Sequence, residues 1–395
     1  MHVQNHAMSL AAPTLMQMLR ALIAAPSVSS VSPQFDQSNR AVVELLAVWL
    51  EGLGFRSEIL PLPHQPDKFD LIATLGSGPD GLVLAGHTDT VPYDAEGWRT
   101  DPFTLSEADN RLYGLGTSDM KSFFALAIEA ARRYRAEDLV APLILVATAD
   151  EESSMEGALE LVRAGRPRGR YAVIGEPTNL KPVRMHKGIL MEAIRLHGRS
   201  GHSSDPSLGV NALEGMHKVI GALLTLRAEL QTKYQHPGFA VPVPTMNLGH
   251  IHGGDNPNRI CADCELHIDL RPLPGMDIDE LRALLKQRTA QALAGSELRW
   301  EVTPLFCGTP AMETPADSPL VLAAEQLTGA AAGAAAFGTE GPYFRELGMD
   351  ALILGPGDIA QAHQPDEYLA LDRIAPTVDL LGQLIERFCI HPTPR

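Results

Sequence analysis

The stretch GLVLAG, residues 81–86, decides the fold, because it is a short apolar run that ends directly before a histidine. Its length and composition are those of a strand buried on both faces of a sheet. Two similar runs follow, PLILVATA (142–149) and YAVIG (171–175). Helical patterns separate the three runs, at Met120–Arg133 and Gly157–Ala164. This alternation predicts an α/β fold, a mainly parallel sheet with helices on both faces.

The order of the expected helices and strands changes after Pro182. Strands and helices are expected in the order strand, helix, strand, strand, helix, strand, at residues 183–197, 211–230, 245–251, 260–270, 279–293 and 297–303. This order fits a smaller α+β domain with an antiparallel sheet. From residue 304 the helix–strand rhythm returns, and 395 residues exceed one comfortable hydrophobic core. We therefore predict a first domain of residues 1–182 plus 304–395, with residues 183–303 as an inserted domain.

The composition is that of an ordinary folded protein. The chain is 45% hydrophobic and 20% charged, and its 32 Lys and Arg against 48 Asp and Glu give a formal charge of -16. This balance argues against binding of nucleic acid through a basic surface. No apolar run approaches the length of a membrane span, and the first residues, MHVQNHAMSL, lack the basic start and apolar block of a signal peptide. We expect a cytoplasmic protein with neither a nucleic-acid nor a membrane partner.

Side chains of the types that bind metals occur in five segments, each at the end of an expected strand or the start of an expected helix. The segments are LAGHTDTVP (84–92), GLGTSDMKS (114–122), ATADEESSMEG (147–157), VIGEPTN (173–179) and GPGDIAQAHQPDE (355–367). Ligands bind α/β folds at the carboxyl ends of strands, so we expect these segments to converge. Two histidines and three carboxylates suit a pair of Zn²⁺-like ions with one aspartate shared. Such a pair would activate water and polarise a substrate carbonyl, which points to an amide hydrolase.

Two of these segments also suggest how roles are divided within the site. Three consecutive acids, Asp150, Glu151 and Glu152, are costly to pack after a buried strand unless a cation is present. One of the two glutamates can hold a metal while the other faces a cavity as a general base. His87 and Asp89 point to the same side of their strand, so the Asp89 carboxylate can take the second ring N–H of His87. Taken singly, each segment is a weak signal. His87 and Asp89 fit a strand-end turn beside a surface histidine, Asp119 fits a plain helix cap, and the three acids fit a solvated loop.

Together, the five segments resemble those of the dinuclear zinc amidohydrolases, a family that includes acetylornithine deacetylases, succinyl-diaminopimelate desuccinylases, aminoacylases and glutamate carboxypeptidases. The resemblance covers nearly the whole chain. It implies two divalent metal ions, Zn or Co, whose ligands are His87, Asp119, Glu152, Glu176 and His363. His87 and Glu176 would bind one ion, Glu152 and His363 the other, and Asp119 both. It further implies Glu151 as general base, Asp89 as the residue that orients His87, and a cis peptide at Asp119-Met120.

Longer strings are most similar to the acetylornithine deacetylase branch of that family. They include GEPTNLKPVRMHKG (175–188), GHSSDPSLGVNALEGMH (201–217) and LGPGDIAQAHQPDEYL (354–369). This similarity implies hydrolysis of N²-acetyl-L-ornithine to ornithine and acetate in arginine biosynthesis. A succinyl-diaminopimelate desuccinylase or a broader N-acyl-amino-acid hydrolase is the alternative.

The resemblance also assigns residues outside the metal ligands. His202 would stabilise the developing oxyanion, in its own subunit or in the site of a partner. Asn258 and Arg271 would contact the substrate and its carboxylate, although Arg271 is also placed to form a surface ion pair. Thr339 lies in FGTEGPYF (337–344), expected near the substrate side chain. The inserted domain would act as a lid or dimerisation domain of a homodimer.

Two other classes of protein fit parts of the sequence. Ser118-Asp-Met-Lys121 matches the S-x-x-K signature of serine acylases, but neither S-D-N nor K-T-G follows. A serine nucleophile would survive chelation, whereas a metal mechanism would not. A catalytically inactive relative used only for binding is the second alternative, and such a protein should have lost Glu151 or a metal ligand.

Overall fold

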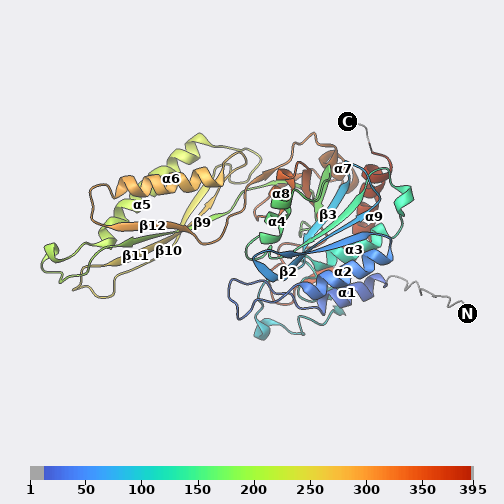
Figure 1. The fold of residues 1–395 in the computed structure, drawn as a ribbon, viewed down its shortest axis with the longest axis horizontal. Coiled ribbons are helices and arrows are strands. Elements are labelled where there is room, and N and C mark those ends of the chain that lie inside the picture. The colour runs from blue at the N-terminus through green and yellow to red at the C-terminus, as the bar shows by residue number, and fades with distance from the viewer. Residues whose placement is uncertain (1–12, 393–395) are drawn as a thin grey trace, which may run out of the picture. The chain divides into compact units, whose positions relative to one another are not determined.

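The computed structural model describes residues 13–392, and it divides the chain into two compact units (Figure 1). The first unit comprises Met1–Arg184, Thr314–Gly333 and Thr339–Arg395, and the second comprises Met185–Glu313 and Ala334–Gly338. The prediction that the N-terminus lacks a signal peptide falls largely on residues outside the described range. Within residues 13–392, no helix is both long and apolar enough to cross a bilayer.

The helices and strands alternate along most of the chain. The helices are α1 (Leu15–Ile23), α2 (Arg40–Gly52), α3 (Lys121–Ala131), α4 (Glu156–Ala164), α5 (Ala212–Lys233), α6 (Ile278–Ala292), α7 (Pro319–Thr328), α8 (Gly341–Glu346) and α9 (Ile374–Ile385). The strands are β1 (Arg56–Leu62), β2 (Gln65–Leu75), β3 (Leu82–His87), β4 (Ser106–Ala108), β5 (Arg111–Tyr113), β6 (Leu143–Thr148), β7 (Tyr171–Ile174), β8 (Val183–His186), β9 (Leu190–His197), β10 (Thr245–Gly253), β11 (Asp263–Arg271), β12 (Arg299–Pro304), β13 (Met312–Glu313), β14 (Gly333–Ala335), β15 (Asp350–Ile353) and β16 (Tyr368–Ala370).

A large mixed sheet carries the strands that the sequence predicted as its centre. Its order is β1-β2-β6-β3-β7-β15-β8-β13, with β14 beside β8. The four central strands, β6, β3, β7 and β15, are parallel, so their carboxyl ends lie at one edge. The flanking pairs β1–β2, β2–β6 and β15–β8 are antiparallel. The expected parallel sheet is therefore confirmed at the centre, whereas the β1–β2 hairpin, closed by the short turn at Pro63-His64, adds an antiparallel edge.

Helices cover both faces of this sheet, as predicted. Helices α1, α2, α3, α7 and α9 share one hydrophobic core with alternate residues of the central strands, such as Leu84, Leu145 and Val173. Helices α4 and α8 lie near each other (Figure 1). They pack together through Ala158 and Tyr343, and they contact the sheet strands β2 and β7. Because successive strand residues point to opposite faces, this two-layer covering explains why all six residues of β3 are buried.

The second unit is built on a smaller antiparallel sheet of order β10-β11-β9-β12. Helices α5 and α6 pack on it around a separate core that includes Ile194, Leu223 and Leu285. The sequence predicted one strand over residues 183–197, and this was wrong. The chain breaks at 187–189 because β8 pairs in the large sheet while β9 pairs in the small one. Gly188 permits the break, since a Cβ there would lie 2.7 Å from the Thr309 main-chain oxygen.

Tight packing at Gly175 brings β7 close to α3. The Gly175 N–H donates to the Ala85 carbonyl at 2.9 Å, and a Cβ on Gly175 would lie 2.1 Å from the buried Phe123 ring. Only glycine allows the end of this strand to approach the helix so closely. The next residue is Glu176, so this contact fixes where the Glu176 side chain begins.

We predict that Gly175→Ala destabilises the protein by about 1–3 kcal/mol, because the added methyl overpacks a dense core. Gly52→Ala is the matched control, since a Cβ at Gly52 in α2 meets nothing within 4 Å. The control should leave the free energy of unfolding unchanged or raise it by up to about 1 kcal/mol. Urea denaturation of both variants measures the difference. Equal stabilities would mean that Phe123 moves aside freely.

Candidate metal centre

The predicted metal ligands converge at the carboxyl ends of the parallel strands. His87 is the last residue of β3, Glu152 follows β6, Glu176 follows β7, His363 follows β15, and Asp119 lies two residues before the start of α3. Parallel neighbours in the sheet place these segments side by side, as the general rule for α/β folds predicts. The Asp119-Met120 peptide is cis, as the resemblance implied.

Two three-residue clusters form there, and they share Asp119. One cluster is His87, Asp119 and Glu176, and the other is Asp119, Glu152 and His363. In each cluster the possible ligand atoms all lie within 4.8 Å of one another. The distances within the clusters show that each histidine turns one nitrogen, Nε2, towards two carboxylates. His87 Nε2 lies 3.1 Å from Asp119 and 3.9 Å from Glu176, and His363 Nε2 lies 3.0 Å from Glu152 and 3.5 Å from Asp119.

This donor set fits two divalent cations. Each cluster supplies one imidazole and two carboxylates, which suits zinc, cobalt or manganese. A single carboxylate common to both clusters can bind two ions at once. The clustered carboxylates also favour bound cations, because like charges repel strongly in a buried site.

The pKa values of the site residues are shifted because several carboxylates lie close together. Burial and the charge of neighbouring carboxylates raise the pKa values of Glu151 and Glu176 well above their usual range. Burial alone would lower the pKa of His87, but its hydrogen bond with Asp119 and the surrounding carboxylates raise it well above normal. Hydrogen bonds with Asp119 and Glu152 raise the pKa of His363 to about 10. The two histidines thus supply the positive charge that balances the carboxylates of the two clusters. Bound metal ions would supply this charge instead.

Glu151 differs from Glu152 in its surroundings. A third group that could hold a metal joins His87, Glu151 and Glu152. Among the residues that the structure describes, however, the Glu151 carboxylate has no hydrogen-bond or ion-pair partner, whereas Glu152 accepts from His363. Partly exposed and unpaired, Glu151 is placed to exchange protons with a substrate.

Asp89 acts differently from the sequence expectation. The atom closest to His87 Nδ1 is the main-chain oxygen of Asp89, at 3.0 Å, while its carboxylate is 3.7 Å away. The carboxylate instead accepts the main-chain N–H groups of Glu151 and Glu152, at 3.3 and 3.1 Å. Alternation along a strand gives the side to which Asp89 points, but not which of its oxygens lies nearest to the ring. Asp89 therefore contacts His87 mainly through its backbone and holds the acidic turn through its side chain.

The sequence profile of the peptidase family M20/M25/M40 matches residues 83–387, which include every residue of both clusters. The chain belongs to this family. Acetylornithine deacetylases are among its relatives: that of Edwardsiella ictaluri is 54% identical over 95% of this chain and 98% of its own length. That of Proteus mirabilis is 51% identical over 97% and 99%, respectively.

Solved structures of the family share the fold. The M20 metallo-carboxypeptidase Sso-CP2 of Sulfolobus solfataricus aligns with a TM-score of 0.73 at 17% identity, covering 95% of this chain and 99% of its own. The YXEP protein of Bacillus subtilis, described as a dinuclear metal-binding M20 peptidase, aligns with a TM-score of 0.63 at 15% identity, covering 94% and 98%. At such identities the likeness establishes the fold alone.

The serine acylase interpretation of this M20 chain fails on geometry. Lys121 is fully buried, and its Nζ donates to the main-chain oxygens of Leu22 and Ala25, at 3.4 and 2.8 Å. The Ser118 hydroxyl instead exchanges hydrogen bonds with the backbone of Asp358. Ser118 and Lys121 thus have structural partners, and the lysine is not placed to activate the serine.

Two supporting residues of the M20 site, Lys68 and Glu367, were not predicted from the sequence. Lys68, buried in β2, pairs with Asp150 at 2.8 Å and with Asp36 at 2.6 Å. Asp150 precedes the two glutamates and adopts a left-handed backbone with φ of 59°. Glu367, four residues after His363, is also buried, and burial raises its pKa to about 8. Lys68 lies in the polar first half of β2, QPDKFD, so no feature of the sequence indicated that it is buried and paired.

The remaining predicted residues lie apart from the clusters in sequence. His202, Asn258 and Arg271 belong to the second unit, and Thr339 to the first. The Nε of Arg271 donates to Asp269, the ion pair that was its alternative interpretation. Thr339 is fully buried and accepts the Gly341 N–H at the start of α8. The roles of all four in binding or catalysis stay predictions.

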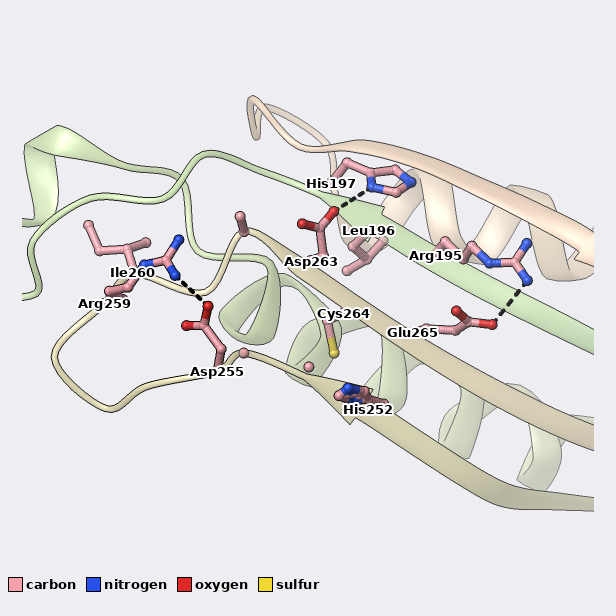
Figure 2. Close-up of a pocket in the computed structure, with 13 residues that line it drawn as sticks. Arg195, Leu196, His197, His252, Asp255, Arg259, Ile260, Asp263, Cys264 and Glu265 are labelled. Carbon is pink, nitrogen blue, oxygen red and sulfur yellow. Dashed lines mark hydrogen bonds and ion pairs between the residues drawn. The ribbon is translucent and has the colours of Figure 1, made fainter.

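A pocket of about 320 Å³ on the second unit contains none of the predicted ligands (Figure 2). Arg195 pairs with Glu265 and Arg259 with Asp255, while His197 Nδ1 lies 2.7 Å from the Asp263 carboxylate. Because these carboxylates already have partners within the pocket, it does not resemble a metal site.

We predict that removal of divalent ions lowers the unfolding temperature of the protein. Each ion present at a thousand times its Kd contributes about 4 kcal/mol to stability, and its loss leaves the clustered carboxylates unscreened. Calorimetry before and after chelation measures the change. In the metal-free state Glu151→Gln should unfold at a higher temperature than the wild type, because it removes one of the repelling acids. A metal-free variant less stable than the metal-free wild type would contradict this electrostatic account.

Proposed function

We propose that this chain hydrolyses the acetamide of N²-acetyl-L-ornithine, releasing L-ornithine and acetate as a step of arginine biosynthesis. The observation that carries the proposal is the pair of clusters sharing Asp119, one buried and one opening to solvent at His363, beside an unpaired Glu151. The acetylornithine deacetylases at 54% and 51% identity over nearly the whole chain support the choice of substrate.

The two units have different proposed tasks. The first would hold the metal ions and the reacting groups, and the second would act as a lid and as the dimerisation surface of a cytoplasmic homodimer. The partner molecule is a small N-acetyl amino acid. An acidic protein with a formal charge of -16 suits a substrate whose side chain ends in an amine.

The five ligands would divide between two ions, Zn or Co. His87 and Glu176 would bind one, Glu152 and His363 the other, and Asp119 both. When bound, such ions supply Lewis-acid chemistry, polarising the carbonyl of the acetamide and lowering the pKa of water.

Glu151 would carry the proton through the reaction. Its carboxylate takes a proton from the attacking water as the new C–O bond forms at the acetyl carbon. It then gives this proton to the amide nitrogen as the C–N bond breaks, so that ornithine leaves as an amine and acetic acid remains, which ionises to acetate as the amine takes up the proton. Burial and the charge of Glu176 raise the pKa of Glu151, which makes its carboxylate a stronger base for taking up a proton from water.

His202 would stabilise the oxyanion of the tetrahedral intermediate. Its Nδ1 lies 3.2 Å from the Ser204 main-chain nitrogen, which can only donate. In this hydrogen bond Nδ1 must be the unprotonated acceptor, so the proton of the neutral ring sits on Nε2. The ring is exposed and therefore presents an N–H donor to the surroundings. Asn258 and Arg271 on the same unit, with Thr339 on the first, are proposed to contact the substrate and its carboxylate.

The test of the function is acetate release from a panel of acyl amino acids, with and without a chelator. Acetylornithine should be hydrolysed fastest, and chelation should abolish the activity until Zn²⁺ or Co²⁺ is restored. Succinyl-diaminopimelate and other N-acetyl amino acids serve as competitors in the panel. Activity that survives complete removal of metal would contradict the mechanism, and a faster reaction with another substrate would reassign the specificity.

Glu151→Gln should lower turnover by about 100- to 10,000-fold while both metal ions stay bound, because the amide cannot accept a proton. Glu152→Gln is the matched control, and it should lose metal as well as activity. Turnover is followed by acetate release, and bound metal by elemental analysis. If Glu151→Gln loses metal and Glu152→Gln keeps it, the two roles are exchanged.

His202→Ala should lower turnover by about 100- to 1,000-fold with the metal content unchanged, since it removes one donor to the oxyanion. If the dimer places His202 in the partner's site, mixing His202→Ala with Glu151→Gln should restore part of the activity, because some sites in mixed dimers carry both intact residues. Subunit exchange is verified with differently tagged chains. Exchange without restored activity would assign each site to one chain, and normal turnover of His202→Ala would remove it from the mechanism.

A further inference from the structure

Glu367 is a buried carboxylate that faces main-chain donors instead of a cation. It directly precedes β16 and is 1% exposed. Its Oε1 accepts the N–H groups of Ser118 at 2.6 Å and Asp119 at 2.9 Å, and its Oε2 accepts that of Gly116 at 3.1 Å. One side chain thus binds three amides of the short loop that ends in Asp119.

The backbone around Glu367 strengthens this attachment. Strand β16 pairs antiparallel with β5, which leads into the same loop. The Glu367 main-chain oxygen accepts the Gly114 N–H at 3.0 Å. The loop from Gly114 to Asp119 is therefore bound at four points by a single residue.

The segment that carries His363 contacts this loop a second time. Asp358 accepts the Ser118 hydroxyl proton through its main-chain oxygen at 3.2 Å, and its N–H donates back to the same hydroxyl at 2.9 Å. A Cβ on Gly357 would lie 2.3 Å from the Ser118 main-chain oxygen, so the two backbones are in direct contact there. Ser118 and Asp119 are thus fixed from both ends of the segment 357–367, with His363 between them.

The contacts of Glu367 are neither those of a salt bridge nor those of a metal ligand. Across residues 13–392, it forms no ion pair with a lysine, arginine or histidine, although its charge partly offsets the effect of burial on the pKa of Lys121. It belongs to none of the groups there that could hold a metal. A buried carboxylate is costly unless hydrogen-bonded, and here the compensating donors all belong to the loop of the shared aspartate.

We propose that Glu367 is a positioning residue that fixes Asp119 relative to His363, and thereby sets the affinity of both metal ions. The inference rests on the proposed function only in that Asp119 and His363 are taken as ligands. Because Asp119 belongs to both clusters, displacing it weakens two sites at once. Groups that orient metal ligands typically change metal affinity by about 10- to 100-fold when removed.

Glu367→Gln tests the proposal with almost no change of shape. The amide keeps one acceptor oxygen but turns an NH₂ group towards main-chain N–H donors, so at least one amide of the loop loses its acceptor. Glu367→Asp keeps the charge and both acceptors on a shorter side chain, and it should recover part of the loss. Glu192→Gln is the matched control, since Glu192 is fully buried in the second unit and pairs with Arg282 at 2.7 Å.

Two measurements are made on each purified full-length variant. A zinc series buffered by chelator gives the metal affinity, and hydrogen exchange of the metal-free protein reports on the amides of residues 116–119. Glu367→Gln should bind Zn²⁺ about 10- to 100-fold more weakly and exchange these amides faster. Glu367→Asp should lie between it and the wild type. Glu192→Gln should match the wild type in both measurements, even if its unfolding temperature falls.

Each outcome separates this inference from the proposed function. If Glu367→Gln unfolds at a lower temperature but binds Zn²⁺ as the wild type does, Glu367 is merely structural and the inference is overturned. It is also overturned if Glu192→Gln loses the same affinity, or if Glu367→Asp alone folds and shows wild-type affinity and exchange. A wild type that binds two Zn²⁺ ions but does not hydrolyse acetylornithine would reject the proposed function and leave the role of Glu367 intact.

Discussion

The convergence of carboxylates on Asp119 is the interaction on which the rest of this structure depends. Glu152, Glu176 and Asp119 reach one edge of the sheet from separate strands, and in a buried site their mutual repulsion opposes folding. Only His87 and His363 face them within the two clusters. The fold can hold this arrangement because the four parallel strands are buried on both faces and fix where each loop begins. Divalent ions remove the repulsion, so the site that performs the proposed chemistry is also a site where metal binding and stability are linked.

The loops that carry these ligands are held by other carboxylates, through main-chain N–H groups. Asp89 accepts from Glu151 and Glu152, and Glu367 accepts from the loop of Asp119. A charge-assisted hydrogen bond to an amide is short and directional, so two or three of them fix a loop of few residues well. These loop-binding carboxylates explain why the region around the metal centre contains more Asp and Glu residues than the metal ligands alone.

Local patterns in the sequence were enough for the strand ends and for the residue types beside them. His87 and Glu176 were found because each follows a short apolar run, and the central parallel strands were expected for the same reason. Contacts between residues far apart in the sequence could not be predicted from these local patterns. The bond between Glu367 and the Asp119 N–H joins residues 248 positions apart, and the break between β8 and β9 depends on the approach of Thr309 to Gly188. The hydrophobic periodicity of the sequence predicts neither this hydrogen bond nor this break, because both depend on how distant segments pack. The nearest oxygen of Asp89 was missed because it depends on the local path of the chain after β3.

Main-chain amides also have an advantage over lysine or arginine as partners for these supporting acids. A mobile ammonium near the centre could turn towards Glu152 or Glu176 and compete with a metal ion for the carboxylate. An N–H group fixed in the backbone cannot move in this way. The placement of Lys68 agrees with this reasoning, since it pairs with Asp150 and Asp36 and with none of the cluster residues. Lys121 is likewise engaged by carbonyl oxygens of the chain near α1. The two buried lysines thus bind neighbouring acids and carbonyls. The carboxylate oxygens that face the centre are left for the metal ions that the clusters would bind.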